Sequence, residues 1–335
     1  VDERFGGTWD DLRAARASTA VPLLAKGFFS TEADLRTAKE AGADAVLLLL
    51  RDLDDATARR LMRVAADLGL DTLVEAHDAA ELARAAALRA PVIGINARDL
   101  STFAIDRETQ LRLVLEAYEL GLPLVVAESG IQTRAQGAAA ELAGADAILV
   151  GSALMQAPDP AEKLRDLLRR PLVKVCGLTR EEDVAVAAEA GADLAGFVLV
   201  PDSPRAAAEV LPVPDELLAV AVWVGEAGES AATLDQVHER VPQKVRGRDG
   251  WLFWNDLPVA RLLDLPWEAE DPEHWDRAAA EEGRVVLAGK LAADNVGEAI
   301  RRVRPWAVDA SSRLERAPGI KDHDAVRAYV EAARS

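Results

Sequence analysis

One phrase recurs along this chain and constrains its fold more than any other feature. It is Gly-Ala-Asp followed by a short apolar run, and it occurs in EAGADAVLLLL (40–50), ELAGADAILVGS (141–152) and EAGADLAGFVLV (189–200). Glycine can end a helix in the left-handed conformation at little cost, and a continuous apolar run is typical of a strand buried on both faces of a parallel sheet. Amphipathic segments such as TEADLRTAKEA (31–41) separate these runs. The chain is therefore predicted to be a string of β-α units with parallel strands joined by crossover helices.

Polar or reactive residues end the apolar runs, about one β-α unit apart. These strand-end residues are Lys26, Glu75, Asn96, Glu128, Ser152 and Cys176. In an open doubly wound sheet only the strands at the switch point carry such residues, whereas in a β/α barrel the loops at the carboxyl ends converge on one pocket. The set favours a barrel, although strand ends that meet water also take polar residues.

Composition excludes several classes of function. The 335 residues include 39 Lys and Arg against 57 Asp and Glu, and the net charge of −18 disfavours nucleic acid as a partner. No apolar run is long enough to cross a membrane, and the start VDERFGGTWDD lacks the layout of a secretion signal, so a cytoplasmic protein is expected. The single cysteine excludes a disulfide framework. The four histidines lack metal-ligand spacing and no Gly-x-Gly-x-x-Gly follows a strand, so neither a metal nor another cofactor is expected.

Five segments of the first half carry a resemblance to a known family. They are LLAKGFF (23–29), TLVEAHD (72–78), IGINARDLSTFAID (93–106), VAESGI (126–131) and LVGSALM (149–155). In this order and spacing they resemble indole-3-glycerol-phosphate synthase, a (βα)8 barrel. The resemblance covers residues 1–170.

The second half resembles a different barrel enzyme, phosphoribosylanthranilate isomerase. The segments that carry this resemblance are VKVCGLTREEDV (173–184), DSPR (202–205), VVLAGKLAADNV (285–296) and VDASSRLERAPGIKD (308–322). The two enzymes occur fused in this order in some bacteria and catalyse consecutive steps of tryptophan synthesis. The resemblances therefore imply an α/β chain of two tandem barrels, at 1–170 and 171–335, acting on sugar-phosphate derivatives of anthranilate.

The first resemblance implies ring closure of 1-(2-carboxyphenylamino)-1-deoxyribulose 5-phosphate, with loss of carbon dioxide and water. It assigns Lys26 as the general acid, with a lowered pKa, and Glu75 as the general base. It places the substrate among Asn96, Arg98, Glu128 and Ser129, and its phosphate on Gly130, Gly151 and Ser152. Glycine lets an anion approach the backbone closely, and the start of a helix favours negative charge.

The second resemblance implies an Amadori rearrangement of N-(5-phosphoribosyl)anthranilate. It assigns Cys176 as the general base and Asp309 as the general acid. A thiolate can serve as that base if its pKa is lowered by its neighbours. Arg205 is expected to pair with the substrate carboxylate, which suits a planar guanidinium. The phosphate is expected on Gly289, Ser311 and Ser312.

Both halves depart from their family patterns. The chain is expected to begin after the second strand of the synthase barrel, without the Glu-x-Lys motif of its first strand, and Gly27 replaces an aspartate. In the second half one β-α unit is expected to be missing between 224 and 285, and the Gln-Leu-His-Gly strand end has no counterpart but QKVRGRDG (243–250). The segment WLFWNDLPVARLLDLPW (251–267) is predicted to be a rebuilt strand or an apolar packing surface. Lys290 and Arg313 replace phosphate-loop glycines.

Both barrels are therefore predicted to be incomplete, and a monomer is expected unless open strand edges promote association. Two other hypotheses stay open. One is a catalytically impaired barrel pair or fragment that still binds phosphate ligands. The other is a different phosphate-binding barrel such as a relative of ribulose-phosphate epimerase, against which the pairing of KVCGLT with PGIKD counts.

Overall fold

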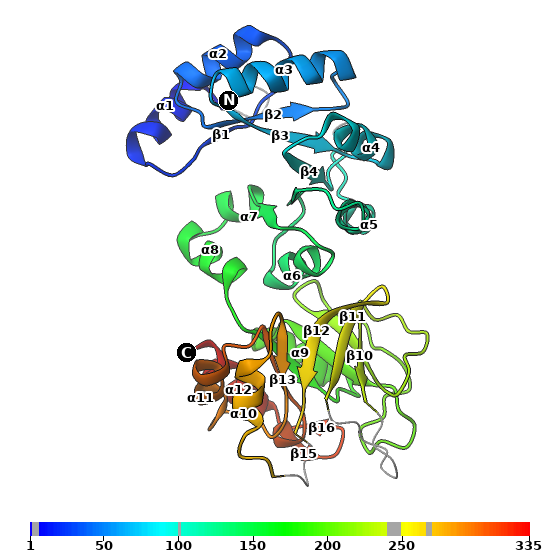
Figure 1. The fold of residues 1–335 in the computed structure, drawn as a ribbon. Helices are drawn as coiled ribbons and strands as arrows, with labels where there is room; N and C mark the ends of the chain where they lie inside the picture. The colour runs from blue at the N-terminus through cyan, green and yellow to red at the C-terminus, as the bar shows by residue number, and fades with distance from the viewer. Residues whose placement is uncertain (2–6, 100–101, 240–248, 266–269) are drawn as a thin grey trace. The chain divides into compact units, whose positions relative to one another are not determined.

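The computed structural model describes residues 1, 7–99, 102–239, 249–265 and 270–335. Its contacts divide the chain into two compact units (Figure 1). The first unit comprises Val1–Gln132 and Ala140–Ala157, and the second comprises Thr133–Ala139 and Pro158–Ser335. The predicted functional boundary at 170/171 remains a prediction. No helix in the described ranges is both long and apolar enough to span a membrane.

The first unit is built on a six-stranded sheet in which each strand pairs in parallel with its neighbour in the sequence. The strands are β1 (Leu24–Ala25), β2 (Ala45–Leu49), β3 (Asp71–Ala76), β4 (Val92–Asn96), β5 (Leu124–Glu128) and β6 (Ala147–Leu149). The helices in this part of the chain are α1 (Trp9–Ser18), α2 (Glu32–Glu40), α3 (Asp55–Asp67), α4 (Ala79–Leu88), α5 (Arg107–Glu119), α6 (Arg134–Leu142), α7 (Ser152–Met155) and α8 (Pro160–Leu168). The predicted alternation of strands and helices is confirmed, and the sheet is an open part of a barrel.

The recurring Gly-Ala-Asp phrase has the same structural role each time. Its glycines adopt positive φ angles of 97°, 109° and 87° at Gly42, Gly144 and Gly191, where the helix ends. Its aspartates each accept a hydrogen bond at 2.8 Å from the first residues of the preceding strand segment, which ties the start of one strand to the next. The pairs are Asp44 with the N–H of Leu23, Asp146 with that of Val125 and Asp193 with that of Val173.

The second unit contains a closed eight-stranded barrel. Its strands are β7 (Leu172–Cys176), β8 (Leu194–Val198), β9 (Leu218–Val224), β10 (Leu234–His238), β11 (Gly250–Trp254), β12 (Leu257–Leu263), β13 (Val285–Leu287) and β14 (Ala307–Ala310). Around it lie α9 (Glu181–Glu189), α10 (His274–Ala280), α11 (Val296–Val303), α12 (His323–Arg334), a 3-10 turn (Ser312–Leu314) and the ribbon of β15 (Glu315–Ala317) with β16 (Ile320–Lys321).

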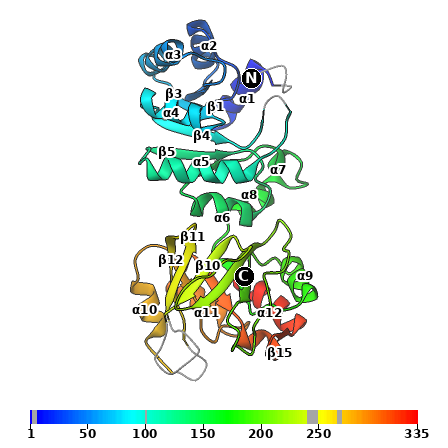
Figure 2. The same ribbon diagram turned by 90° about the vertical axis from the view of Figure 1, so that its right-hand side faces the viewer.

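Strand β11 lies between β10 and β12 and completes the closed barrel, and Figure 2 labels these three strands side by side. Strand β11 runs antiparallel to both neighbours, and a tight turn with positive φ at Asn255 and Asp256 joins it to β12. Over its described residues the segment 251–267 thus forms parts of two strands of the sheet. This agrees with the prediction of a rebuilt strand, the first of the two alternatives for this segment. Over its described residues the second half has four α-helices around a closed eight-stranded sheet, so the expectation of an incomplete second barrel is wrong for its sheet.

The expected absence of the Gln-Leu-His-Gly strand end needs correction. Most of QKVRGRDG (243–250) lies outside the described residues. A Gln-x-His pair nevertheless stands at the end of β10, as Gln236 and His238, and β10 pairs in parallel with β9. The prediction failed because β10 is short and mixed in polarity, with Asp235 and Gln236 inside it, so no apolar run marks it.

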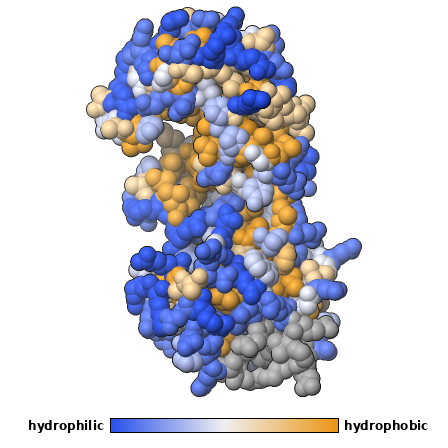
Figure 3. Space-filling model, in the orientation of Figure 1, coloured by the Kyte–Doolittle hydropathy of each residue, from blue (hydrophilic) through white to orange (hydrophobic). Residues whose placement is uncertain are grey.

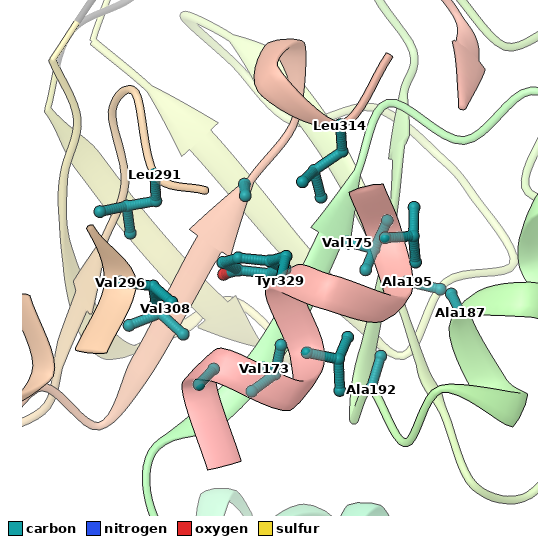
Figure 4. Packing of buried hydrophobic residues seen from close by; sticks show 14 of the residues in the cluster. Val173, Val175, Ala187, Ala192, Ala195, Leu291, Val296, Val308, Leu314 and Tyr329 are labelled. Atoms are coloured by element: carbon teal, nitrogen blue, oxygen red, sulfur yellow. The ribbon is translucent and has the colours of Figure 1, made fainter. Parts of the chain in front are cut away.

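Packing differs between the units. In the second, Tyr329 of α12 lies fully buried among Val173, Val175 and Val308 of the barrel strands (Figure 4). In the first, the cluster of Leu47, Leu49 and Leu73 is bordered by partly exposed apolar residues, among them Leu24 and Leu149 of the edge strands. On the face viewed in Figure 3, hydrophilic residues predominate and apolar residues form patches between them.

Candidate active sites

The first unit gathers its strand-end residues into one polar cluster. Lys26, just after β1, donates from Nζ to Glu75 Oε2 at 3.2 Å and to Glu128 Oε2 at 2.5 Å. Asn96 of β4 donates from Nδ2 to Glu75 Oε1 at 2.9 Å. The parallel register sets Asn96 beside Glu128 and Glu75 beside Gly94. Four of the predicted residues therefore meet at the carboxyl ends of four strands.

The two carboxyl groups of this cluster differ in their affinity for a proton. Burial raises the pKa of Glu128 to about 7, reinforced by the nearby Glu75 charge, and Lys26 offsets only part of this. Burial acts on Glu75 in the same direction, but hydrogen bonds and charge from His77, Lys26 and Asn96 outweigh it and lower its pKa to about 2. At neutral pH Glu75 is thus ionised, whereas Glu128 can both take up and release a proton. Acid–base chemistry needs such a difference in pKa between two groups.

The ammonium of Lys26 is not set up as the resemblance implies. Burial lowers its pKa, yet the carboxylates of Glu128 and Glu75 raise it by more, so the net shift is upward rather than downward. Its side chain remains 44% exposed, whereas those of Glu75 and Glu128 are buried. Lys26 is therefore a charged donor that faces the solvent side of the cluster.

Glycine in the middle of β4 makes room for the Glu128 carboxyl. A Cβ at position 94 would lie 1.9 Å from Glu128 Oε1, well inside contact distance. This Oε1 is buried and has no hydrogen-bond partner among the described residues. Gly94 thus admits a carboxyl group into the sheet interior.

His77 belongs to the same cluster, although the sequence analysis assigned it no role. Its Nε2 lies 3.2 Å from Glu75 Oε1 and its Nδ1 lies 3.1 Å from Glu81 Oε2. Burial opposes protonation, but hydrogen bonds to the two glutamates prevail and raise the His77 pKa to about 9. The histidine within TLVEAHD, two residues after a strand-end glutamate on the same strand face, was the available signal.

A cavity of about 360 Å³ adjoins Lys26. Its lining includes five further predicted site residues: Arg98, Ser129, Gly130, Gly151 and Ser152. Ser129 and Gly130 follow β5 with successive positive φ angles of 68° and 70°, which turn the backbone around the cavity. Gly27 also lines it, so the position of the missing aspartate faces the same space. Glu75, Asn96 and Glu128 contact Lys26 or one another but are not part of this lining.

The second unit has a larger cavity, of about 460 Å³, at the carboxyl ends of its parallel strands. All six residues predicted for this half line it: Cys176, Arg205, Gly289, Asp309, Ser311 and Ser312. Gln236, His238 and Asp264 line it as well. The prediction that strand ends converge on one pocket describes this unit well.

Cys176 stands over a buried lysine. Lys174, two residues earlier on β7 and only 1% exposed, donates from Nζ to Asp309 Oδ2 at 2.8 Å and to Gln236 Oε1 at 2.7 Å. Burial raises the pKa of the Cys176 thiol, and hydrogen bonding and charge from Lys174 oppose this without reversing it. The condition of a lowered thiol pKa is therefore not met in the structure. A Cβ at Gly196 would lie 2.7 Å from Cys176 Sγ, so this glycine makes room for the thiol.

Asp264 is the pocket acid that the sequence analysis missed. It follows β12, and burial together with the charge of Asp309 raises its pKa to about 7. By contrast, Oδ2 of Asp309 is engaged by Lys174. The signal was present, because ARLLD (260–264) is an apolar run ending in a carboxylate. It was overlooked because the segment was interpreted as a packing surface or a single strand.

Arg205 is engaged within the chain. Its Nε lies 2.8 and 2.9 Å from the two carboxyl oxygens of Glu315, which also accepts from the buried Lys321 at 2.8 Å. A substrate carboxylate at Arg205 would therefore compete with Glu315 or share the guanidinium with it. The two substituted loop positions behave differently: Lys290 lines the pocket with φ of 57°, while Arg313 pairs with Asp294 at 2.6 Å.

Over the described ranges, no group of three or more His, Cys, Asp or Glu is placed to hold a metal ion.

Comparisons with known proteins find similar proteins for both halves of the chain. The family model for indole-3-glycerol phosphate synthase matches residues 2–167, and that for N-(5'phosphoribosyl)anthranilate isomerase matches residues 273–332. The indole-3-glycerol phosphate synthase of Albidiferax ferrireducens is 45% identical over 49% of this chain and 61% of its own length. Among solved structures, TrpF from Jonesia denitrificans is 27% identical over 49% of this chain and 97% of that one, with a TM-score of 0.40.

Two relatives span nearly the whole chain. The tryptophan biosynthesis protein TrpCF of Salmonella typhi is 34% identical over 96% of this chain and 78% of its own length. Its counterpart in Yersinia pestis is 32% identical over 100% of this chain and 76% of its own length. The chain therefore belongs to the TrpCF family, the bifunctional tryptophan biosynthesis proteins that join a synthase and an isomerase.

Proposed function

We propose that this chain catalyses two steps of tryptophan synthesis at two separate sites, ring closure at the Lys26 cluster and isomerisation at the Cys176 pocket. The observation that carries the proposal is the grouping of acid–base residues at strand ends beside a cavity in each unit. We further propose that residues 1–170 and 171–335 are the functional halves, that the protein works as a monomer in the cytoplasm, and that its substrates are sugar phosphates of anthranilate.

In the first site Lys26 is the proposed general acid. Ring closure needs a proton on the carbonyl oxygen of the substrate, and later on the hydroxyl group that leaves as water. The exposed Lys26 ammonium borders the cavity and can donate that proton. Glu75, held ionised by His77 and Asn96, is the proposed base. Glu128, with its pKa of about 7, can return a proton to Lys26 across their 2.5 Å contact.

The remaining predicted residues of the first site bind the substrate in this proposal. Arg98 and Ser129 border the cavity, and Asn96 holds Glu75 in place. The phosphate binds the backbone N–H groups of Gly130, Gly151 and Ser152, which border the same cavity.

In the second site the proposed proton donor is Asp264, with Asp309 as the alternative given by the resemblance. Opening of the furanose ring needs a neutral acid, and the pKa of Asp264, raised to about 7, favours its protonated form more than that of an ordinary aspartate. A proton on Oδ2 of Asp309 would compete with the Lys174 ion pair. Cys176 is the proposed base that takes the proton from C2' of the opened imine. Substrate binding must favour its thiolate, with Lys174 as the nearby positive charge.

Arg205 and the loops after β13 and β14 bind the two charged ends of this second substrate in the proposal. Arg205 takes the anthranilate carboxylate, sharing its guanidinium with Glu315. Gly289, Ser311 and Ser312 take the phosphate.

The test is a turnover assay for both reactions on the purified chain, combined with calorimetry using a non-reactive analogue of each substrate. We expect turnover of both substrates. Binding of the analogues without turnover would instead select an impaired barrel pair that only binds phosphate ligands. Absence of both turnover and binding would refute the functional assignment for this chain.

A further inference from the structure

Four polar side chains at the second pocket contact one another in series. Lys174 Nζ lies 2.7 Å from Gln236 Oε1, Gln236 Nε2 lies 2.9 Å from His238 Nε2, and His238 Nδ1 lies 3.8 Å from Asp264 Oδ2. Gln236 is fully buried, and Lys174 beneath it is buried as well. The series therefore connects the buried Lys174 to Asp264, the proposed acid, through Gln236 and His238.

The orientation of each group follows from its donors and acceptors. An ammonium group only donates, so Gln236 must turn its carbonyl oxygen toward Lys174 and its NH2 group toward His238. The NH2 group only donates, so His238 Nε2 must accept. A ring nitrogen that accepts carries no proton, and the proton of the neutral imidazole then sits on Nδ1, the nitrogen that faces Asp264.

Protonation of His238 on both nitrogens would disrupt this arrangement. It would set an N–H of the ring against the NH2 group of a buried amide at 2.9 Å, two donors without an acceptor between them. The amide cannot turn round to accept, because its nitrogen would then face the Lys174 ammonium at 2.7 Å. Leaving buried donors unpaired is unfavourable.

We propose that His238 is a neutral hydrogen-bond donor in the isomerase pocket, and that Lys174 fixes its tautomer through Gln236. The Nδ1–H group would donate a hydrogen bond to a substrate oxygen adjacent to the oxygen that Asp264 protonates. It would keep its own proton, so the proton balance of the reaction is unchanged. The catalytic consequence rests on the proposed isomerase function, whereas the tautomer does not.

The tautomer can be measured by ¹⁵N NMR of the imidazole rings at neutral pH. The chain has four histidines, and His238→Asn identifies the signals of this one. We expect a protonated Nδ1 and an unprotonated Nε2. In Gln236→Glu both carboxylate oxygens accept, so we expect a proton to appear on Nε2. A wild-type ring protonated on Nε2, or no change in Gln236→Glu, would overturn the proposal.

A pair of amide substitutions tests the catalytic part. The side-chain nitrogen of Asn lies near the position of Nδ1, and that of Gln near the position of Nε2, so only Asn can keep the proposed donor. We expect isomerase kcat/KM to be about tenfold lower in His238→Gln than in His238→Asn, the effect of one hydrogen bond. Equal activity, or higher activity in His238→Gln, would contradict the role of the Nδ1 donor even if the NMR result stood.

Discussion

Each unit pairs a lysine with carboxyl groups near its strand ends, two for Lys26 and one for Lys174, but the two lysines lie at different depths. Lys26 joins Glu75 and Glu128 from just beyond the end of β1 and stays 44% exposed. Lys174 lies inside β7, two residues before the strand-end Cys176, and is 1% exposed. Because barrel side chains point inward in layers, a shift of two residues along a strand turns a lysine that can reach substrate into one that supports the residues above it.

The largest expected effect is on stability, and it should separate the two lysines. Lys174→Met leaves Asp309 and Gln236 without their buried partner, and we expect a loss of about 3–5 kcal/mol in the free energy of unfolding. Lys26→Met should cost less, because Glu75 keeps His77 and Glu128 can take up a proton. Urea denaturation measures the free energy of unfolding of both variants. A loss in Lys26→Met that equals or exceeds the loss in Lys174→Met would contradict the difference between the two lysines.

The two space-making glycines give a sharper comparison. Gly94→Ala should destabilise the protein by about 1–3 kcal/mol through overpacking. Because the added Cβ meets Glu128 Oε1, the double variant Gly94→Ala/Glu128→Ala should recover most of that loss. Gly196→Ala is the matched case: its Cβ meets Lys174 Cε and the Cys176 backbone as well as Sγ, so Cys176→Ala should rescue it only in part. Thermal unfolding of these four variants would show whether the rescues differ.

The dependence of stability on pH should identify Glu128. Its pKa rises from 4.5 to about 7 on folding, so the folded state holds the extra proton between these values. Its stabilising contribution is present below pH 4.5 and is lost as the pH rises through about 7, by up to about 3 kcal/mol. Glu128→Gln should flatten that decline in urea denaturation between pH 5 and pH 8. An unchanged slope would show that another group carries it.

Glu75 should act in the opposite sense. Its folded pKa of about 2 lies below 4.5, so its contribution is present above pH 4.5 and is lost as the pH falls toward 2. Glu75→Gln should therefore reduce the acid sensitivity of the first unit, as followed by circular dichroism. Because the Glu75 charge helps to raise the pKa of Glu128, the same substitution should also lessen the decline toward pH 8, but by less than Glu128→Gln does. The pair of glutamates gives opposite slopes from one cluster.

The smallest expected effect concerns the phosphate loops. The first unit uses glycine at a positive φ of 70° in Gly130, whereas the second has Lys290 at 57°. Lys290→Gly should stabilise the protein by about 1 kcal/mol or less, because glycine adopts this conformation without steric cost. A loss of stability would show that the Lys290 side chain contributes more through its contacts than its backbone costs.

The sequence predicted the features that depend on local pattern. The Gly-Ala-Asp phrase located helix ends and strands, and the strand-end rule found residues that meet at Lys26 and around Cys176. The hydrogen bond from each aspartate to the preceding strand was not predicted, because it joins residues 20 or 21 positions apart in the chain.

The features that escaped prediction depend on long-range contacts. Closure of the second barrel relies on the hairpin turn at Asn255 and on an antiparallel register that no apolar run announces. Pairing of Arg205 with Glu315 joins residues 110 positions apart. The lowered pKa expected for Lys26 became a raised one because two carboxylates converge on it in the folded chain.

The most direct test of two independent sites is to assay both reactions in Lys26→Met and in Cys176→Ala. General acid or base groups contribute about 10²- to 10⁴-fold to a rate. We expect Lys26→Met to lose ring closure by such a factor and keep isomerisation, and Cys176→Ala to do the reverse. The assignment of one site to each unit would be contradicted if either substitution abolished both reactions, or if neither reaction were affected.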